Sequence, residues 1–205
     1  MEEEGVDQRY AGALETSWED FFQRELEELA ELSGGTLEGD KLNVGILNRT
    51  AVVDPSSRTI TWSDGSDIDD DVKVLLLHYM LRSAGRVEGR LASYREFPGG
   101  ELYYSVFHGR AIVPLIRTFG ERAEALAIAG EKLGASRASR GDASIDLRFF
   151  PYVPINVTVW EGDDEVPASA NILFDSIVGS VMPAEDLAHL SAELVEMLME
   201  ADREA

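Results

Sequence analysis

The 205-residue sequence contains no cysteine. This absence excludes disulfides, thiolate nucleophiles, and zinc or iron–sulfur sites held by the chain's own thiolates. Histidine is also scarce: His78, His108 and His189 have neither HxxxH nor HExxH spacing, so we expect no metal site. Walker, G-x-G-x-x-G and G-x-S-x-G motifs are absent as well. The sequence therefore identifies no catalytic residue.

Basic residues are few, 18 against 39 acidic ones, which gives a formal net charge of −21. This charge repels phosphate backbones and anionic lipid, so we expect neither nucleic acid nor a membrane surface as a partner. Two explanations of the charge stay open: solubility in a salty or warm cytoplasm, or a surface that docks a basic partner. No apolar run reaches the roughly 18 residues that span a bilayer. The acidic start MEEEGVDQRY lacks the apolar region of a signal peptide, which predicts a cytoplasmic location.

Apolar periodicity predicts helices in four regions and a fifth at the C-terminal end. We expect residues 1–15 to be a flexible acidic segment, followed by a helix that Thr16 caps together with Glu19. Its apolar stripe consists of Trp18, Phe22, Leu26 and Leu29. Further helices are expected over 70–84, 102–119, 121–133 and from 184 onward, with Pro114 kinking or ending the second of these.

Alternating apolar residues predict strands over 42–46, 51–53, 58–62, 145–149, 155–160 and 171–174, and a short extended piece is expected over 87–96. Strands and helices come in separate blocks, so we predict an α+β fold with a mainly antiparallel sheet and four to five helices. One globular domain is expected over residues 16–203. Residues 155–160 should form an interior strand, and the C-terminal helix should pack its leucine stripe against that sheet. This stripe consists of Leu187, Leu190, Leu194 and Leu198.

Polar and aromatic side chains gather at two turns of the predicted fold. The first follows Trp160, where Glu161, Asp163, Asp164 and Glu165 form an acidic loop. Such a loop is either a solvated turn or a chelator of a hard cation, and the solvated turn is the commoner outcome.

The second turn lies in the segment Tyr94 to Tyr104, which contains Pro-Gly-Gly. Here Arg95 and Glu96 hold either a ligand carboxylate or the loop itself through an ion pair. Turn residues that a rigid strand positions are common in binding sites.

These two turns and the histidines indicate a module that binds a small molecule or organic cofactor without catalysis of its own. The identity of a cofactor does not follow from the sequence, although His78 or His108 would be able to ligate a metal or tetrapyrrole if they converge. The ligand-binding candidates are His78, Tyr79, Arg95, Glu96, Tyr104, His108, Trp160 and Glu161.

Two other functions stay open. One is an enzyme in which Glu96, Glu161 or Glu165 acts with His78 or His108 as general acid and base. The other is a structural or interaction protein, with a homodimer as one form, whose polar turns merely build the fold.

Four separated segments resemble a prokaryotic family of unknown function, found largely in anaerobic bacteria and archaea. They are LLLHYMLRSAG, SYREFPGGELYY, VTVWEGDDEVPASANILFDS and MPAEDLAHL. The resemblance covers roughly residues 15–200 and implies no catalytic residue. Some relatives resemble fusions to a cysteine-rich iron–sulfur module, a module that this chain lacks.

Overall fold

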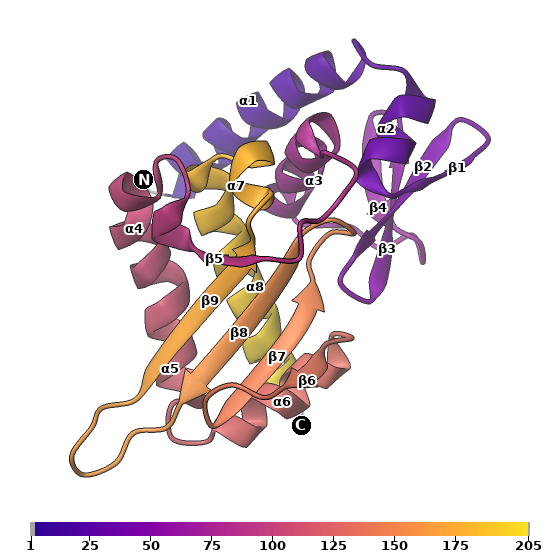
Figure 1. Cartoon of the computed structure of the whole chain (residues 1–205). Helices are drawn as coiled ribbons and strands as arrows, with labels where there is room; N and C mark the ends of the chain where they lie inside the picture. Colours follow the sequence, from indigo (N-terminus) through magenta and orange to yellow (C-terminus); the bar gives the residue numbers. More distant parts are fainter. Residues whose placement is uncertain (1–2, 205) are drawn as a thin grey trace. The chain divides into compact units, whose positions relative to one another are not determined.

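Two antiparallel sheets and several helices form the α+β fold that the sequence predicts (Figure 1). This computed structural model describes the backbone of residues 3–204 and the side chains of residues 12–204. The chain divides into two compact units. The first extends to Arg86 and also contains Phe150–Tyr152, whereas the second contains Val87–Phe149 and the residues from Val153 onward. The single domain expected over 16–203 stays a prediction.

The four-stranded sheet of the first unit is a meander, in which each strand pairs with the next one along the chain. Its strands are β1 (Thr36–Glu38), β2 (Lys41–Ile46), β3 (Arg49–Asp54) and β4 (Thr59–Trp62). Leu42, Val44 and Ile46 are fully buried and alternate with partly exposed neighbours. This alternation confirms the prediction of a sheet with one apolar face.

The helices of the first unit are α1 (Glu3–Phe21), α2 (Leu26–Ser33) and α3 (Asp70–Arg82). The expected start of a helix at Thr16 is wrong, because the described part of the segment 1–15 already lies in α1. The hydroxyls of Thr16 and Ser17 donate to backbone carbonyls one turn earlier, those of Gly12 and Ala13. A serine or threonine inside a helix bonds in this way, which leaves it no role as a cap.

The second unit is built on a five-stranded antiparallel sheet with the order β5-β9-β8-β7-β6. Its strands are β5 (Leu91–Ser93), β6 (Ser136–Ala138), β7 (Ala143–Arg148), β8 (Pro154–Trp160) and β9 (Ser169–Asp175). Strand β8 is interior, as predicted, and pairs with β7 and β9. Its residues Ile155, Val157 and Val159 share one buried face.

The polar side chains on the other face of β8 are buried as well. Asn156 donates from its amide to the hydroxyl of Ser144 at 2.9 Å, and that hydroxyl lies 2.9 Å from the hydroxyl of Thr158. All three side chains are at most 2% exposed. Because each polar group has a partner, burial of this face does not leave unsatisfied donors.

The helices of the second unit are more numerous than the sequence suggested, because the segment expected over 102–119 is divided. They are α4 (Gly100–Phe107), η2 (His108–Ile112), α5 (Val113–Phe119), α6 (Ala123–Lys132), α7 (Val178–Val181) and α8 (Ala184–Arg203), with the short 3₁₀ turn η1 (Tyr94–Glu96) before α4. Helices α5, α6 and α8 lie behind the sheet in Figure 1. Gly130 of α6 lies so close to Ile145 of β7 that a Cβ atom would come within 2.7 Å of the isoleucine side chain.

Helix α8 buries its expected stripe, since Leu187, Leu190, Leu194 and Leu198 are all fully buried. In space, the backbone of α8 lies close to those of α4, α6 and η2. The helix therefore packs among other helices of the second unit, on the side of the sheet where Figure 1 shows it. The expected packing of its stripe against the sheet stays a prediction. No helix in the described part of the chain is both long and apolar enough to cross a membrane.

Candidate functional site

A small pocket of about 140 Å³ lies in the second unit, where β5 gives way to the 3₁₀ turn η1. Elements distant in sequence form it: β5, η1, α4 with η2, and β9. Its lining residues are Ser93, Tyr94, Arg95, Tyr104, Phe107, Ile112, Ala170 and Asn171. Two of these, Arg95 and Tyr104, belong to the set expected from the sequence.

Arg95 is held over the ring of Tyr104, with the guanidinium carbon 3.7 Å from the ring centroid. Its Nε lies 3.5 Å from a carboxylate oxygen of Glu101, and just over half of the side chain is exposed. A guanidinium over an aromatic face is stabilised by about 0.5–1 kcal/mol at exposed sites. The stacking contact and the ion pair together restrict the orientation of the guanidinium plane at the pocket.

Three polar groups of the pocket have no hydrogen-bond partner among the side chains described, residues 12–204. They are the terminal nitrogens of Arg95, the hydroxyl of Tyr104 and the amide of Asn171. Asn171 and Tyr104 are half-buried. Among the described residues no buried side-chain nitrogen or oxygen lacks a partner, so these three groups are open to solvent. They converge on one pocket and are able to bond a ligand there.

The apolar wall of the pocket is rigid. Tyr94 and Phe107 stack with nearly parallel rings, 4.2 Å apart at the centroids. The hydroxyl of Tyr94 donates to the backbone carbonyl of Ala184 at 2.6 Å. Burial is the main cause that raises the pKa of Tyr94 to about 12, and the nearby Tyr103 and Glu185 contribute the rest of this shift. Tyr94 is thus a neutral wall residue whose only hydroxyl proton is already donated within the fold.

The raised pKa of Tyr94 predicts a loss of stability at alkaline pH. The unfolded chain releases this proton near the ordinary value of about 10, and the folded chain releases it near 12. Between these values the folded state binds more protons, so the free energy of unfolding falls as pH rises from 10 to 12. Tyr94→Phe lacks this proton, and its deficit relative to wild type, about 1 kcal/mol at pH 8, is expected to shrink by pH 11.

Urea denaturation at pH 8 and at pH 11 measures the difference in the free energy of unfolding between wild type and Tyr94→Phe at each pH. Tyr104→Phe is the matched control, because it removes a half-buried hydroxyl and keeps Tyr94. A deficit of Tyr94→Phe that stays constant between the two pH values would contradict the prediction.

A π-helical turn, η2, interrupts the helix beside the pocket, and its last residue Ile112 lines the pocket. Its position has a local cause in Pro114, which lies in the first turn of α5. In an α-helix the proline ring would clash with the carbonyl four residues earlier, that of Arg110. The wider π turn changes the register before Pro114, and the helical segment continues as α5 to Phe119, so Pro114 does not end it. Such turns occur frequently at functional sites.

Two acidic candidates serve the fold. Glu96 accepts a hydrogen bond from the backbone N–H of Ser93 at 2.7 Å and completes a capping box around η1. Those bonds to Ser93 lower the pKa of Glu96, and Arg90 lowers it further. Glu161 accepts from the backbone N–H of Ala123 at 2.6 Å, at the first residue of α6. Neither residue lines the pocket.

Two further candidates of the second unit lie near the pocket without lining it. The ring of His108 is 5.7 Å from that of Tyr104. Trp160 pairs across the sheet with Ser169, two residues before Asn171, and is 40% exposed.

His78 and Tyr79 belong to α3 of the first unit, whereas every lining residue of the pocket belongs to the second. Tyr79 is 1% exposed, donates to the backbone carbonyl of Ser33 at 2.8 Å and stacks on Phe150. It also accepts from the backbone N–H of Tyr152. These contacts make Tyr79 a core residue of the first unit.

The acidic loop after Trp160 has its own internal bonds. One oxygen of Asp163 accepts from the backbone N–H groups of Glu165 and Val166, at 2.8 and 2.7 Å, and these bonds lower the pKa of Asp163. Asp164 and Glu165 are exposed. The arrangement is that of a solvated turn which Asp163 closes.

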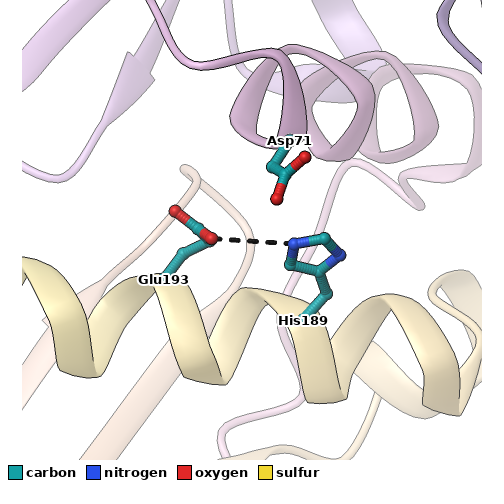
Figure 2. A group of neighbouring side chains, drawn as sticks. All are labelled: Asp71, His189 and Glu193. Atoms are coloured by element: carbon teal, nitrogen blue, oxygen red, sulfur yellow. Dashed lines mark ion pairs between the residues drawn. The ribbon is translucent and has the colours of Figure 1, made fainter. Parts of the chain in front are cut away.

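A histidine–carboxylate pair lies on α8, outside the expected set (Figure 2). Nε2 of His189 is 3.6 Å from a carboxylate oxygen of Glu193, one turn later, and each side chain is about one-fifth exposed, 20% and 22%. The i, i+4 spacing places the two side chains on one helix face. Glu193 is therefore half-buried and paired.

Six lining residues of the pocket were not among the ligand-binding candidates: Ser93, Tyr94, Phe107, Ile112, Ala170 and Asn171. Asn171 carried a signal, because an amide inside an apolar strand is unusual. The pairing of Ser93 with Leu173 brings β5 beside β9, and such a register does not follow from either segment alone.

Comparison with known proteins gives a family and no activity. No curated protein and no solved structure matches the chain. The family model called domain of unknown function (DUF3786) matches residues 25–197, most of the chain, so the protein belongs to this family.

Proposed function

We propose that the protein is a binding or accessory module without catalysis of its own, and that its small-molecule ligand occupies the pocket around Arg95, Tyr104 and Asn171. The observation that carries the proposal is the convergence of three unpaired polar groups on one pocket. A ligand that pairs with these groups replaces the hydrogen bonds that they otherwise make to water. Such pairing commonly fixes the orientation of a ligand in an otherwise apolar pocket.

Two features of the surroundings support binding. The wall of Tyr94 and Phe107 is already stacked and bonded in the described structure, so a ligand need not order it. A preformed wall lowers the entropic cost of binding. The π turn η2, whose position Pro114 explains, brings Ile112 to the pocket, and such turns occur frequently at functional sites.

A thermal-shift screen of metabolites and organic cofactors tests the proposal. A ligand at 100 times its dissociation constant adds about 2.7 kcal/mol of stability, which raises the melting temperature by roughly 5–10 °C for a protein of this size. Ala170→Leu adds three carbon atoms to a lining position and is expected to abolish the shift. Ala170→Ser is the matched control, because it keeps the space.

The proposal predicts a shift for wild type and for Ala170→Ser and none for Ala170→Leu. A screen in which no compound stabilises the wild-type protein would overturn it. Equal stabilisation of Ala170→Leu would place the ligand elsewhere, which also contradicts the proposal.

The two alternatives have less support. An acid–base enzyme would need Glu96, Glu161 or Glu165 beside His78 or His108. Glu96 and Glu161 accept hydrogen bonds from backbone N–H groups, and Glu165 is exposed on the acidic loop and does not line the pocket. A homodimer is favoured by one surface feature: Leu102 is 80% exposed, and Val106 and Val113 are also exposed on the same helical segment. Sedimentation of the purified chain distinguishes a dimer from a monomer.

A cytoplasmic location and the absence of nucleic-acid partners stay part of the proposal. The net charge of −21 supports the absence of nucleic-acid partners.

A further inference from the structure

We infer that the pocket binds a short aliphatic carboxylate. This inference rests on the proposed function and narrows it to one chemical class. It follows from three properties of the pocket: the charge and shape of Arg95, the donors beside it, and the size and apolar character of the remaining wall.

The guanidinium of Arg95 is only partly used within the protein. Its face lies on Tyr104 and its Nε pairs with Glu101, at 3.5 Å. Among the described residues, the two terminal nitrogens have no partner. Two parallel N–H groups on a planar fork match the two oxygens of a carboxylate, and this bidentate geometry makes the pairing stronger than a bond to a neutral acceptor.

The other two unpaired groups of the pocket also favour an anionic ligand. The hydroxyl of Tyr104 and the amide of Asn171 are able to donate to an anion, so the pocket offers donors from three side chains. The surrounding charge limits how negative that anion is. Glu101 is beside Arg95, and the whole chain carries −21. A ligand with one negative charge is therefore favoured over phosphate, which carries between one and two negative charges at pH 7.

The size of the pocket limits the length of the group that is attached to the carboxylate. A volume of about 140 Å³ is that of about five water molecules in the liquid, which admits a carboxylate with a tail of a few carbons. Phe107, Ile112 and Ala170 offer this tail an apolar surface. The carboxylate comes either from a free short-chain acid or from the end of a larger molecule, and a direct comparison separates these sources.

Calorimetric titration with four probes at constant ionic strength tests the inference: butyrate, its neutral analogue butyramide, inorganic phosphate, and N-acetylalanine as the carboxylate end of a larger molecule. We expect butyrate to bind at least about tenfold more tightly than butyramide and more tightly than phosphate. If N-acetylalanine binds more tightly than butyrate, the natural carboxylate belongs to a larger molecule, and the ligand class stands.

Arg95→Met is expected to weaken butyrate binding about tenfold or more, and to leave butyramide binding nearly unchanged. Arg95→Lys keeps the charge without the planar fork and is expected to recover only part of the affinity. Arg110→Met is the matched control, because Arg110 is an exposed arginine on η2 that does not line the pocket.

The outcomes separate this inference from the proposed function. If butyramide or phosphate binds as tightly as butyrate, or if Arg95→Met binds butyrate like wild type, the carboxylate inference is wrong. The same holds if neither carboxylate binds. In each case the proposed function stands as long as some compound of the thermal-shift screen stabilises wild type and Ala170→Ser but not Ala170→Leu.

Discussion

Asp175→Ala is expected to lower the free energy of unfolding by about 3–5 kcal/mol. The carboxylate of Asp175 is 2% exposed and accepts three backbone hydrogen bonds. The donors are the N–H groups of Gly89 at 2.6 Å, Glu88 at 3.0 Å and Ile177 at 3.1 Å. Alanine leaves these donors without their acceptor, and each unsatisfied buried group costs about 1–3 kcal/mol.

Chemical denaturation of purified variants measures this loss. Asp164→Ala is the matched control, since Asp164 is an exposed acid of the same unit and is expected to change stability by less than about 0.5 kcal/mol. Asp175→Asn keeps one acceptor oxygen and is expected to fall between the two. Equal small losses for Asp175→Ala and Asp164→Ala would show that this carboxylate does not hold the loop.

The loop that Asp175 holds leads directly to the pocket. Residues 88 and 89 precede β5, and the first residue of β5, Leu91, pairs with Asp175 itself. The last residue of β5 is Ser93, which lines the pocket and precedes Arg95. A buried carboxylate with no place in the pocket therefore sets the position of the strand that delivers the arginine.

Much of the fold was predictable because its longer elements carry a clear apolar period. Strand β8 alternates Ile155, Val157 and Val159, and this pattern correctly predicted an interior strand. The three-residue strands β1 and β6 were missed. The sequence of β6, Ser136–Ala138, has no apolar alternation, and only its pairing with β7 makes it a strand.

The candidate site was predictable where its residues are neighbours in sequence. Arg95 and Tyr104 were expected together, and one helical turn after η1 suffices to bring them into contact. Asn171 joins them through the order of the sheet, which local patterns do not encode. Glu96 was assigned to the ligand, although its spacing from Ser93, S-x-x-E, is the pattern of a capping box.

Leu194→Ala is expected to lower the free energy of unfolding by about 2–5 kcal/mol. Leu194 is fully buried on α8, in the middle of a stripe with Leu190 and Leu198. The substitution removes three carbon atoms from a site where α8 is closely surrounded by α4, α6 and η2. Loss of burial and the cavity left behind both contribute to the cost, because packed helices relax only partly into the space. The melting temperature is expected to fall by roughly 5–15 °C.

Glu200→Ala on the same helix is the control, because Glu200 is exposed and its replacement is expected to change stability by less than about 0.5 kcal/mol. Glu193 is unsuitable for this purpose, since its carboxylate pairs with His189. Similar small losses in Leu194→Ala and Glu200→Ala would mean that α8 is not packed into the second unit.

The position of α8 also matters for the wall of the pocket, because the hydroxyl of Tyr94 donates to the carbonyl of Ala184, the first residue of α8. A loosened α8 is thus expected to reduce ligand stabilisation as well as folding stability, which joins the packing of this helix to the function that we propose.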